Sequence, residues 1–213
     1  MKKLKQLISL VMALMMALSC MVFVAGAAEE TENTEMSQKD STMYVEGTVA
    51  HINDYMEFYN NQDYYINWAR ENGYSLFINV PSEYLEIEKE RVLGENYASE
   101  LLTGIATRGL SAPTAIWNIA QKGKYSFVVE TAASKIYTNY KFTGKTFYTL
   151  TTSNTSNVSS GGTAYGVVGG PKSFSTVPNS TGTSINFFST SNLTSSPIYF
   201  CFNAPAYLFG SIE

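Results

Sequence analysis

Three consecutive β-strand patterns in residues 124–150 constrain the fold of this chain more than any other feature. Aromatic and β-branched residues recur at every second position through 125–130, again through 136–142 and again through 147–151. A period of two in such residues is typical of strands that bury one face. Because one or two hairpins are not stable alone in water, these patterns predict further strands that complete a sheet.

Segments with strand composition surround this stretch on both sides. They lie between clusters of Ser, Thr, Asn and Gly, which are residues that favour turns. The segments are 115–120, 163–168, 183–188, 197–203 and 207–212. Many short strands separated by polar turns predict an antiparallel β-sandwich or jelly-roll-like domain over residues 111–213.

The first 27 residues have the composition of a signal peptide. Lysines at positions 2, 3 and 5 precede an apolar run over 7–24, and Ala25-Gly26-Ala27 supplies the small residues of a cleavage site after Ala27. Two alternatives remain open: the run of about 18 residues is long enough for a retained membrane anchor, and Cys20 offers a site for a lipid anchor. We expect cleavage, and hence an exported protein, secreted or at the cell surface, with no membrane contact.

Cleavage would leave Cys201 as the single cysteine, so the mature chain could form no internal disulfide. An exported protein of this kind is stabilised by its hydrophobic cores alone, a usage common among exported proteins of Gram-positive bacteria. Residues 28–43 are rich in Glu, Thr and Ser and have no apolar periodicity. We expect this segment to be a disordered acidic linker.

Residues 44–107 are expected to form a mainly helical, acidic region, which makes the fold class α+β. Apolar residues at the spacing of one helical face predict a helix over 44–60. These residues are Val45, Val49, Ile52, Met56 and Tyr59. The prediction places His51 on this helix, close to Asp54.

The rest of this region is predicted to continue with mixed structure. A second helix should end at Asn72-Gly73, a short strand is expected over 74–80, and a third helix over 82–93. Period-two alternation within 82–93 leaves a strand open as the alternative there. The carboxylates expected on the solvated face of this helix are Glu86, Glu88 and Glu90.

The charge is divided between the two halves of the chain. Residues 29–100 hold 16 acidic and 4 basic side chains, whereas residues 101–213 hold 2 acidic and 7 basic ones. This asymmetry supports two interpretations: the acidic half docks on the basic half, or the basic half meets an anionic polymer at the cell surface. A further alternative makes residues 28–108 a detachable pro-segment, with Arg108 in an accessible loop as the processing site.

Several catalytic arrangements are excluded by the residues present. His51 is the single histidine and Cys201 the single mature cysteine, so neither a Ser-His-Asp triad in the β-rich half nor a recognisable zinc site can be assembled. Gly161-Gly162 and Gly169-Gly170 lack the spacing of a phosphate-binding loop. We therefore expect a protein that is not an enzyme and has no cofactor. The alternative is an enzyme whose site lies around His51 and neighbouring carboxylates.

Aromatic residues are the abundant chemical class, with 15 Tyr, 12 Phe and 2 Trp. Strand alternation over 136–142 turns Tyr137 outward with Asn139 and Lys141. Exposed rings beside amides are typical of sugar-binding and adhesive surfaces, because a ring offers apolar area with few rotamers to restrict. These three residues and Trp117 are candidate ligand contacts. The expected partner is an extracellular glycan or cell-wall polymer, and not a nucleic acid.

Two segments of the C-terminal half carry a resemblance to known families. YTNYKFTG at 137–144 and YFCFNAP at 199–205 resemble the motifs of small β-modules in secreted proteins of Gram-positive gut bacteria. More distantly, this half resembles the bacterial pre-peptidase C-terminal domain, a jelly-roll-like sandwich. The acidic Asp-x-Asp-Leu stretch often found in that family is absent. The resemblance therefore implies a fold and an extracellular location, and carries over no calcium ligand and no catalytic residue.

Overall fold

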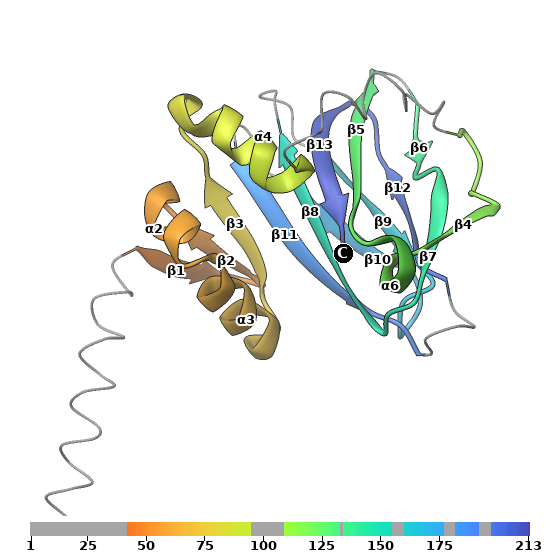
Figure 1. Ribbon diagram of the computed structural model, residues 1–213, viewed down its shortest axis with the longest axis horizontal. Coiled ribbons are helices and arrows are strands. Elements are labelled where there is room, and N and C mark those ends of the chain that lie inside the picture. The colour runs from red at the N-terminus through yellow and green to blue at the C-terminus, as the bar shows by residue number, and fades with distance from the viewer. Residues whose placement is uncertain (1–41, 95–108, 133, 155–159, 177–181, 192–196) are drawn as a thin grey trace, which may run out of the picture. The chain divides into compact units, whose positions relative to one another are not determined.

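The computed structural model describes residues 42–94, 109–132, 134–154, 160–176, 182–191 and 197–213 (Figure 1). Residues from Tyr44 to Glu213 form one compact unit; of the other unit, Met1–Met43, the structure describes only Thr42 and Met43. The predicted signal peptide with Ala27 and Cys20, nearly all of the predicted linker, and Arg108 lie outside the described residues.

The largest sheet has seven strands and contains both halves of the chain. Its strands, in spatial order, are β1 (Met43–Glu46), β2 (Val49–Ile52), β3 (Ser75–Asn79), β11 (Gly182–Ser189), β8 (Phe147–Asn154), β13 (Ala206–Ile212) and β5 (Tyr125–Thr131). β2 and β3 are parallel, whereas the pairs from β3 through β11, β8 and β13 to β5 are antiparallel. The fold is therefore mixed, with mostly antiparallel sheet.

A smaller, four-stranded sheet is antiparallel throughout. Its strands are β10 (Lys172–Ser175), β9 (Gly161–Tyr165), β12 (Tyr199–Phe202) and β6 (Ile136–Tyr137). A parallel pair, β4 (Ala115–Asn118) and β7 (Tyr140–Thr143), continues beside it. Phe142 and Ile198 connect β7 to the chain entering β12, because each amide donates to the carbonyl of the other, at N···O distances of 2.7 and 3.0 Å.

The strand predicted over 136–142 is interrupted at its centre. Thr138 is buried, its amide donates to the carbonyl of Phe200 (2.9 Å), and its hydroxyl donates to the carbonyl of Tyr140 (3.0 Å). These bonds satisfy the amide and hydroxyl of Thr138 in the break between β6 and β7. The alternation of side chains in the sequence gives no sign of this break.

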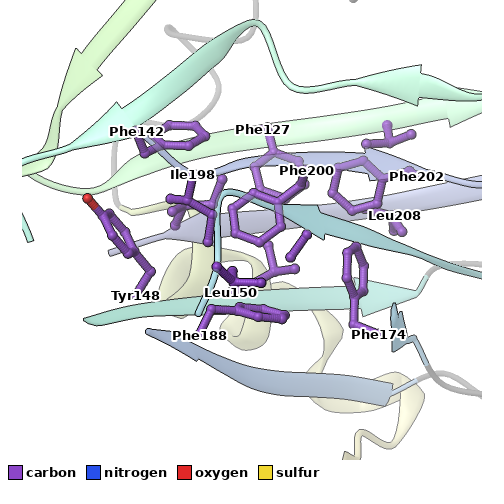
Figure 2. Packing of buried hydrophobic residues seen from close by; sticks show 14 of the residues in the cluster. Phe127, Phe142, Tyr148, Leu150, Phe174, Phe188, Ile198, Phe200, Phe202 and Leu208 are labelled. Carbon is purple, nitrogen blue, oxygen red and sulfur yellow. The ribbon is translucent and has the colours of Figure 1, made fainter. Parts of the chain in front are cut away.

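One core lies between the inner faces of the two sheets (Figure 2). The four-stranded sheet contributes Phe174, Phe200 and Phe202, and the seven-stranded sheet contributes residues such as Leu150 and Leu208. Phe174 meets Phe202 edge to face, with ring centroids 5.6 Å apart and planes at 78°, the arrangement that the ring quadrupoles prefer. The predicted period-two strands place one face in this core, but β8 does not leave its other face exposed: Thr151 and Ser153 are buried as well as Leu150.

The other face of the seven-stranded sheet is covered by helices. They are α2 (Tyr55–Asn60), α3 (Gln62–Asn72), the 3-10 turn η1 (Ser82–Tyr84) and α4 (Leu85–Leu93); a short α6 (Ile119–Lys122) follows β4. In α4, Val92 and Leu93 pack against Phe209 and Val128, which alternate with the inward Leu208 and Val129. α2, α3 and α4 thus lie on the face of the large sheet opposite to the four-stranded sheet (Figure 1), whereas α6 contributes Ile119 to the core between the sheets.

The helix predicted over 44–60 is wrong in its first half. β1 and β2 occupy these residues, Gly47 takes a left-handed φ of 60° between them, and His51 lies on β2. The Val and Ile residues fit one face of a helix, but β-branched residues also favour strands. The pairing of β2 with β3 stabilises the strand rather than the helix. α2 begins only after Asp54, whose carboxylate accepts a hydrogen bond from the Glu57 amide (3.0 Å). With three strands in this region, a mainly helical N-terminal part is not supported.

Other elements of this region agree with the sequence. The end of the second helix is confirmed, because Gly73 closes α3 with a φ of 75° and donates to two carbonyls of the last turn. The strand over 74–80 is found as β3, and the helix over 82–93 is found as η1 and α4.

The pairing of β3 with β11 leads to a prediction about the pro-segment alternative. We expect that cutting the chain beside Arg108, at an inserted site for a specific protease, leaves two fragments that co-elute in gel filtration. The reason is that the four register pairs from Gly182–Asn79 to Ile185–Leu76 keep the fragments in one sheet. Separation in denaturant is the control. Separation of the fragments in native buffer would contradict the prediction and favour a detachable pro-segment.

Candidate functional site

A row of side chains crosses the outer face of the four-stranded sheet, on the side away from the core. Tyr165 of β9 is paired with Tyr199 of β12. The Phe142–Ile198 pair sets Lys141 opposite Tyr199, and Ile116 of β4 is paired with Lys141. Their neighbours in sequence, including Phe200 and Phe142, point into the core, so these four residues point outward. We call Tyr165, Tyr199, Lys141 and Ile116 the tyrosine row.

The two rings of the tyrosine row are stacked on each other, with their planes roughly perpendicular to the sheet surface. The ring centroids of Tyr165 and Tyr199 are 4.9 Å apart and their planes differ by 10°. This separation nearly equals the spacing of neighbouring strands, about 4.8 Å, so the rings stack along the direction between strands. The row therefore offers ring edges and phenolic hydroxyls to the solvent side rather than broad ring faces.

The hydroxyls of the tyrosine row have no hydrogen-bond partner among the described residues. The rings of Tyr165 and Tyr199 are nevertheless half-buried. A phenolic hydroxyl is both donor and acceptor. Two such groups held side by side by ring stacking can bind a hydroxyl-rich ligand without further ordering of the side chains.

The charge at the tyrosine row is positive. The ammonium of Lys141 lies 5.9 Å from the ring centroid of Tyr199 and, in the described part of the chain, has no carboxylate partner. The whole sequence from Thr131 to Ile212 contains no Asp or Glu and four lysines. A cation on this face is thus not neutralised by neighbouring residues of its own sheet.

Tyr137 and Cys201 lie in the next row of the same face, paired across β6 and β12. The Tyr137 ring also approaches Tyr199, with centroids 6.2 Å apart. Burial raises the pKa of the Cys201 thiol, which a hydrogen bond from the Tyr137 hydroxyl and the charge of Lys135 only partly offset. The proximity of Cys201, followed by loss of solvation, raises the pKa of Tyr137. Cys201 is buried, as expected for a thiol that behaves as a small hydrophobic side chain.

The candidate contacts predicted from sequence are only partly brought together. Tyr137 and Lys141 both lie against Tyr199. Asn139 instead donates to the hydroxyl of Tyr125 (3.4 Å), at the break between β6 and β7. Sequence reasoning missed the outward positions of the tyrosine row other than Lys141; they are Tyr165, Tyr199 and Ile116.

Trp117 packs at the edge of the core. Its ring meets Tyr125 and Tyr140, at centroid distances of 5.2 and 5.4 Å, and its indole nitrogen donates to the Gly123 carbonyl (3.1 Å). The ammonium of Lys122 lies 4.8 Å from the ring. The structure thus assigns Trp117 packing contacts, and places it on the strand face opposite to the exposed neighbour Ile116.

A polar depression of about 370 Å³ lies at the other end of β9 and β10. Its lining includes Gly161, Ser173, Ser175 and Asn203. On β9, Gly161 precedes Tyr165 by four residues, or about 13 Å at ~3.3 Å per residue. The lining has hydroxyls, an amide and backbone groups but no titratable side chain, so it offers hydrogen bonds rather than acid–base catalysis.

Glu88 is buried, so its prediction as part of a solvated face is wrong. Its side chain has no exposed area, and Arg91 donates to both carboxylate oxygens at 2.7 Å. The hydroxyls of Tyr55 (3.1 Å) and Thr183 also donate to it. Burial and the charge of Glu88 raise the pKa of Tyr55 above its ordinary range. A carboxylate so enclosed links α4 to α2 and β11 and has no access to a substrate.

His51 lies on β2 among aromatic rings. It stacks on Tyr44, with centroids 4.7 Å apart, and Phe77 approaches it edge-on at 5.3 Å. The Glu46 carboxylate, which is largely exposed, lies 4.0 Å from its Nε2, whereas Asp54 caps α2. The predicted placement of His51 on a helix is therefore wrong, and an enzyme site around it stays a prediction.

No three His, Cys, Asp or Glu side chains of the described residues gather in a way that could hold a metal ion. No helix in this part of the chain is long and apolar enough to cross a membrane. Comparison with known proteins found no matching family model, no similar curated protein and no similar solved structure.

Proposed function

We propose that the protein is a secreted or cell-surface binding module without catalytic activity, with a jelly-roll-like β-sandwich that binds an extracellular glycan or cell-wall polymer. The observation that carries the proposal is the stacked pair Tyr165 and Tyr199, whose hydroxyls lack partners in the described residues. Lys141 and Tyr137 border the pair, and a polar depression lies along the same strand.

The chemistry of this face suits a sugar polymer. Tyrosine supplies contact area with only two rotatable side-chain bonds, so little entropy is lost on binding. Sugar rings present hydroxyls beside C–H groups, and the tyrosine row presents hydroxyls beside ring edges. A polymer that follows β9 would meet Tyr165 and the polar depression at two points about 13 Å apart, which favours an extended ligand over a small molecule.

We expect the double variant Tyr165→Ala/Tyr199→Ala to bind its polymer roughly 30-fold more weakly, at about 1 kcal/mol for each ring. The measurement is co-sedimentation with peptidoglycan and isothermal titration with teichoic acid and a panel of soluble polysaccharides. Tyr59→Ala is the matched control, because Tyr59 is a partly exposed tyrosine of α2, in the helical layer. Thermal unfolding would verify that both variants are folded.

Two results would count against the proposal. One is the absence of binding to every polymer by the full-length mature protein. The other is a loss of affinity in Tyr59→Ala equal to that in the double variant, since this would move the binding surface to the helical layer.

A further inference from the structure

We propose that the ligand of the tyrosine row is an acidic polysaccharide whose sugar rings carry carboxylate groups, and that Lys141 contacts one of these carboxylates. This inference rests on the proposed function and adds to it the charge of the ligand. It is carried by the position of Lys141 within the row, by the absence of acidic residues on this sheet, and by the geometry of the two rings.

The positive charge of the row is separated from the acidic side chains of the protein. The described acidic residues outside the helical region and its strands are only Glu130 and Glu213, and neither belongs to the four-stranded sheet. Most of the described acidic residues lie in the helical layer, which covers the opposite face of the seven-stranded sheet. An anionic ligand would therefore approach the tyrosine row without repulsion from nearby carboxylates, and the acidic layer would disfavour binding on the other side.

Lys141 is placed to bind a charge on a sugar that contacts the row. Its ammonium lies 5.9 Å from the Tyr199 ring centroid, and its strand β7 meets the chain at Ile198, whereas Tyr165 comes from β9, the strand paired with β12. The lysine has no other ionic partner in the described ranges, so a ligand carboxylate would not have to displace one. A carboxylate attached to a sugar ring that touches Tyr199 would lie within reach of this side chain.

The ring geometry argues against a nucleic acid. Proteins that bind single strands stack bases on the faces of aromatic side chains. The rings of Tyr165 and Tyr199 are 4.9 Å apart and nearly parallel, so each covers a face of the other. The sequence from Thr131 to Ile212 also contains no arginine, which is the usual stacking and phosphate-binding cation.

The donor set favours a carboxylate over a phosphate. Phosphate sites commonly combine several donors, such as a helix N-terminus, a nest of backbone amides or an arginine fork. The tyrosine row has one ammonium and two hydroxyls on extended strands, whose backbone amides are used in the sheet. This set matches a singly charged group on a hydroxylated ring.

The test compares acidic polymers with a neutral form of the same polymer. The full-length mature protein is titrated with polygalacturonate, alginate and hyaluronate, with methyl-esterified polygalacturonate, with teichoic acid and with single-stranded DNA. We expect at least one carboxylate polymer to bind, its affinity to fall with added salt, and esterification to weaken binding at least tenfold. Lys141→Gln should lower the affinity for the acidic form about three- to fivefold and leave the esterified form unaffected.

Lys89→Gln is the matched control, because it removes the same charge from α4, on the acidic side of the molecule, where Lys89 pairs with Glu86. Suppose that the protein binds the acidic and esterified forms with equal affinity, and that Tyr165→Ala/Tyr199→Ala abolishes this binding. That result would overturn the inference and leave the proposed function standing. Tighter binding of teichoic acid or DNA, or no binding of any carboxylate polymer, would also overturn it. Binding that is unaffected by the tyrosine substitutions would reject the proposed function itself.

Discussion

Glu88→Ala is expected to lower the free energy of unfolding by about 3–5 kcal/mol, because it leaves the Arg91 guanidinium buried without its partner. Both guanidinium contacts are 2.7 Å long, and the carboxylate they meet has no exposed area. The hydroxyls of Tyr55 and Thr183 would lose their acceptor at the same time. Denaturation of the protein in urea, followed by circular dichroism, measures the change.

The size of this effect should come from the unpaired charge and not from the loss of an ion pair as such. Replacing both partners, in Glu88→Leu/Arg91→Met, should therefore recover most of the stability that Glu88→Ala loses. Glu86→Ala is the matched control on the same helix, since the Glu86 side chain is 73% exposed and should contribute less than about 0.5 kcal/mol. Equal destabilisation by Glu86→Ala and Glu88→Ala would contradict the burial of Glu88.

Phe200→Ala is expected to lower the free energy of unfolding by about 3–5 kcal/mol, because it opens a cavity at the centre of the core. Phe200 has no exposed area, and its ring contacts Phe142, Phe174 and Phe188 at centroid distances of 6.3, 6.0 and 5.4 Å (Figure 2). These contacts come from both sheets, so neighbouring side chains cannot fill the space without moving strands. The same urea denaturation applies.

The neighbouring residue provides the control for Phe200→Ala. Tyr199 points to the opposite face of the same strand and is only half-buried, so Tyr199→Ala should destabilise the protein far less. Tyr199→Ala should instead affect ligand binding. If Tyr199→Ala were as destabilising as Phe200→Ala, the assignment of inner and outer faces on β12 would be wrong.

Local patterns predicted several elements whose own residues carry a clear signal, although the strands among them pair with distant segments. Alternation over 125–130 and 147–151 identified β5 and β8, and Gly73 marked the end of α3, because a left-handed residue closes a helix without tertiary contacts. The same reasoning failed over 44–52. The apolar residues there fit the period of a helix as well as that of a strand, and the pairing of β2 with β3, which comes later in the chain, makes them a strand. Strand pairing of this kind is not visible in a short window of sequence.

The candidate site was likewise predicted only where a local pattern marks its residues. Alternation correctly placed Tyr137 and Lys141 outward, but Asn139 lies in a strand break that depends on the buried bonds of Thr138. Tyr165 and Tyr199 are far apart in the sequence, and no local signal says that β9 and β12 are neighbours in register. Their hydroxyls become one surface only through that pairing.

Local sequence was enough to predict that the C-terminal half is mostly strands, although it missed α6 over 119–122; it also predicted an alternation of aromatic residues between core and surface, and it shows the difference in charge between the halves. Composition and periodicity suffice for these, because they reflect burial of single residues. The tertiary structure decided that β3 joins the sheet of β11, that Glu88 is buried, and that Tyr165, Tyr199 and Lys141 form one row. Each of these depends on contacts between distant segments, whose register is set by the packing of the whole sheet.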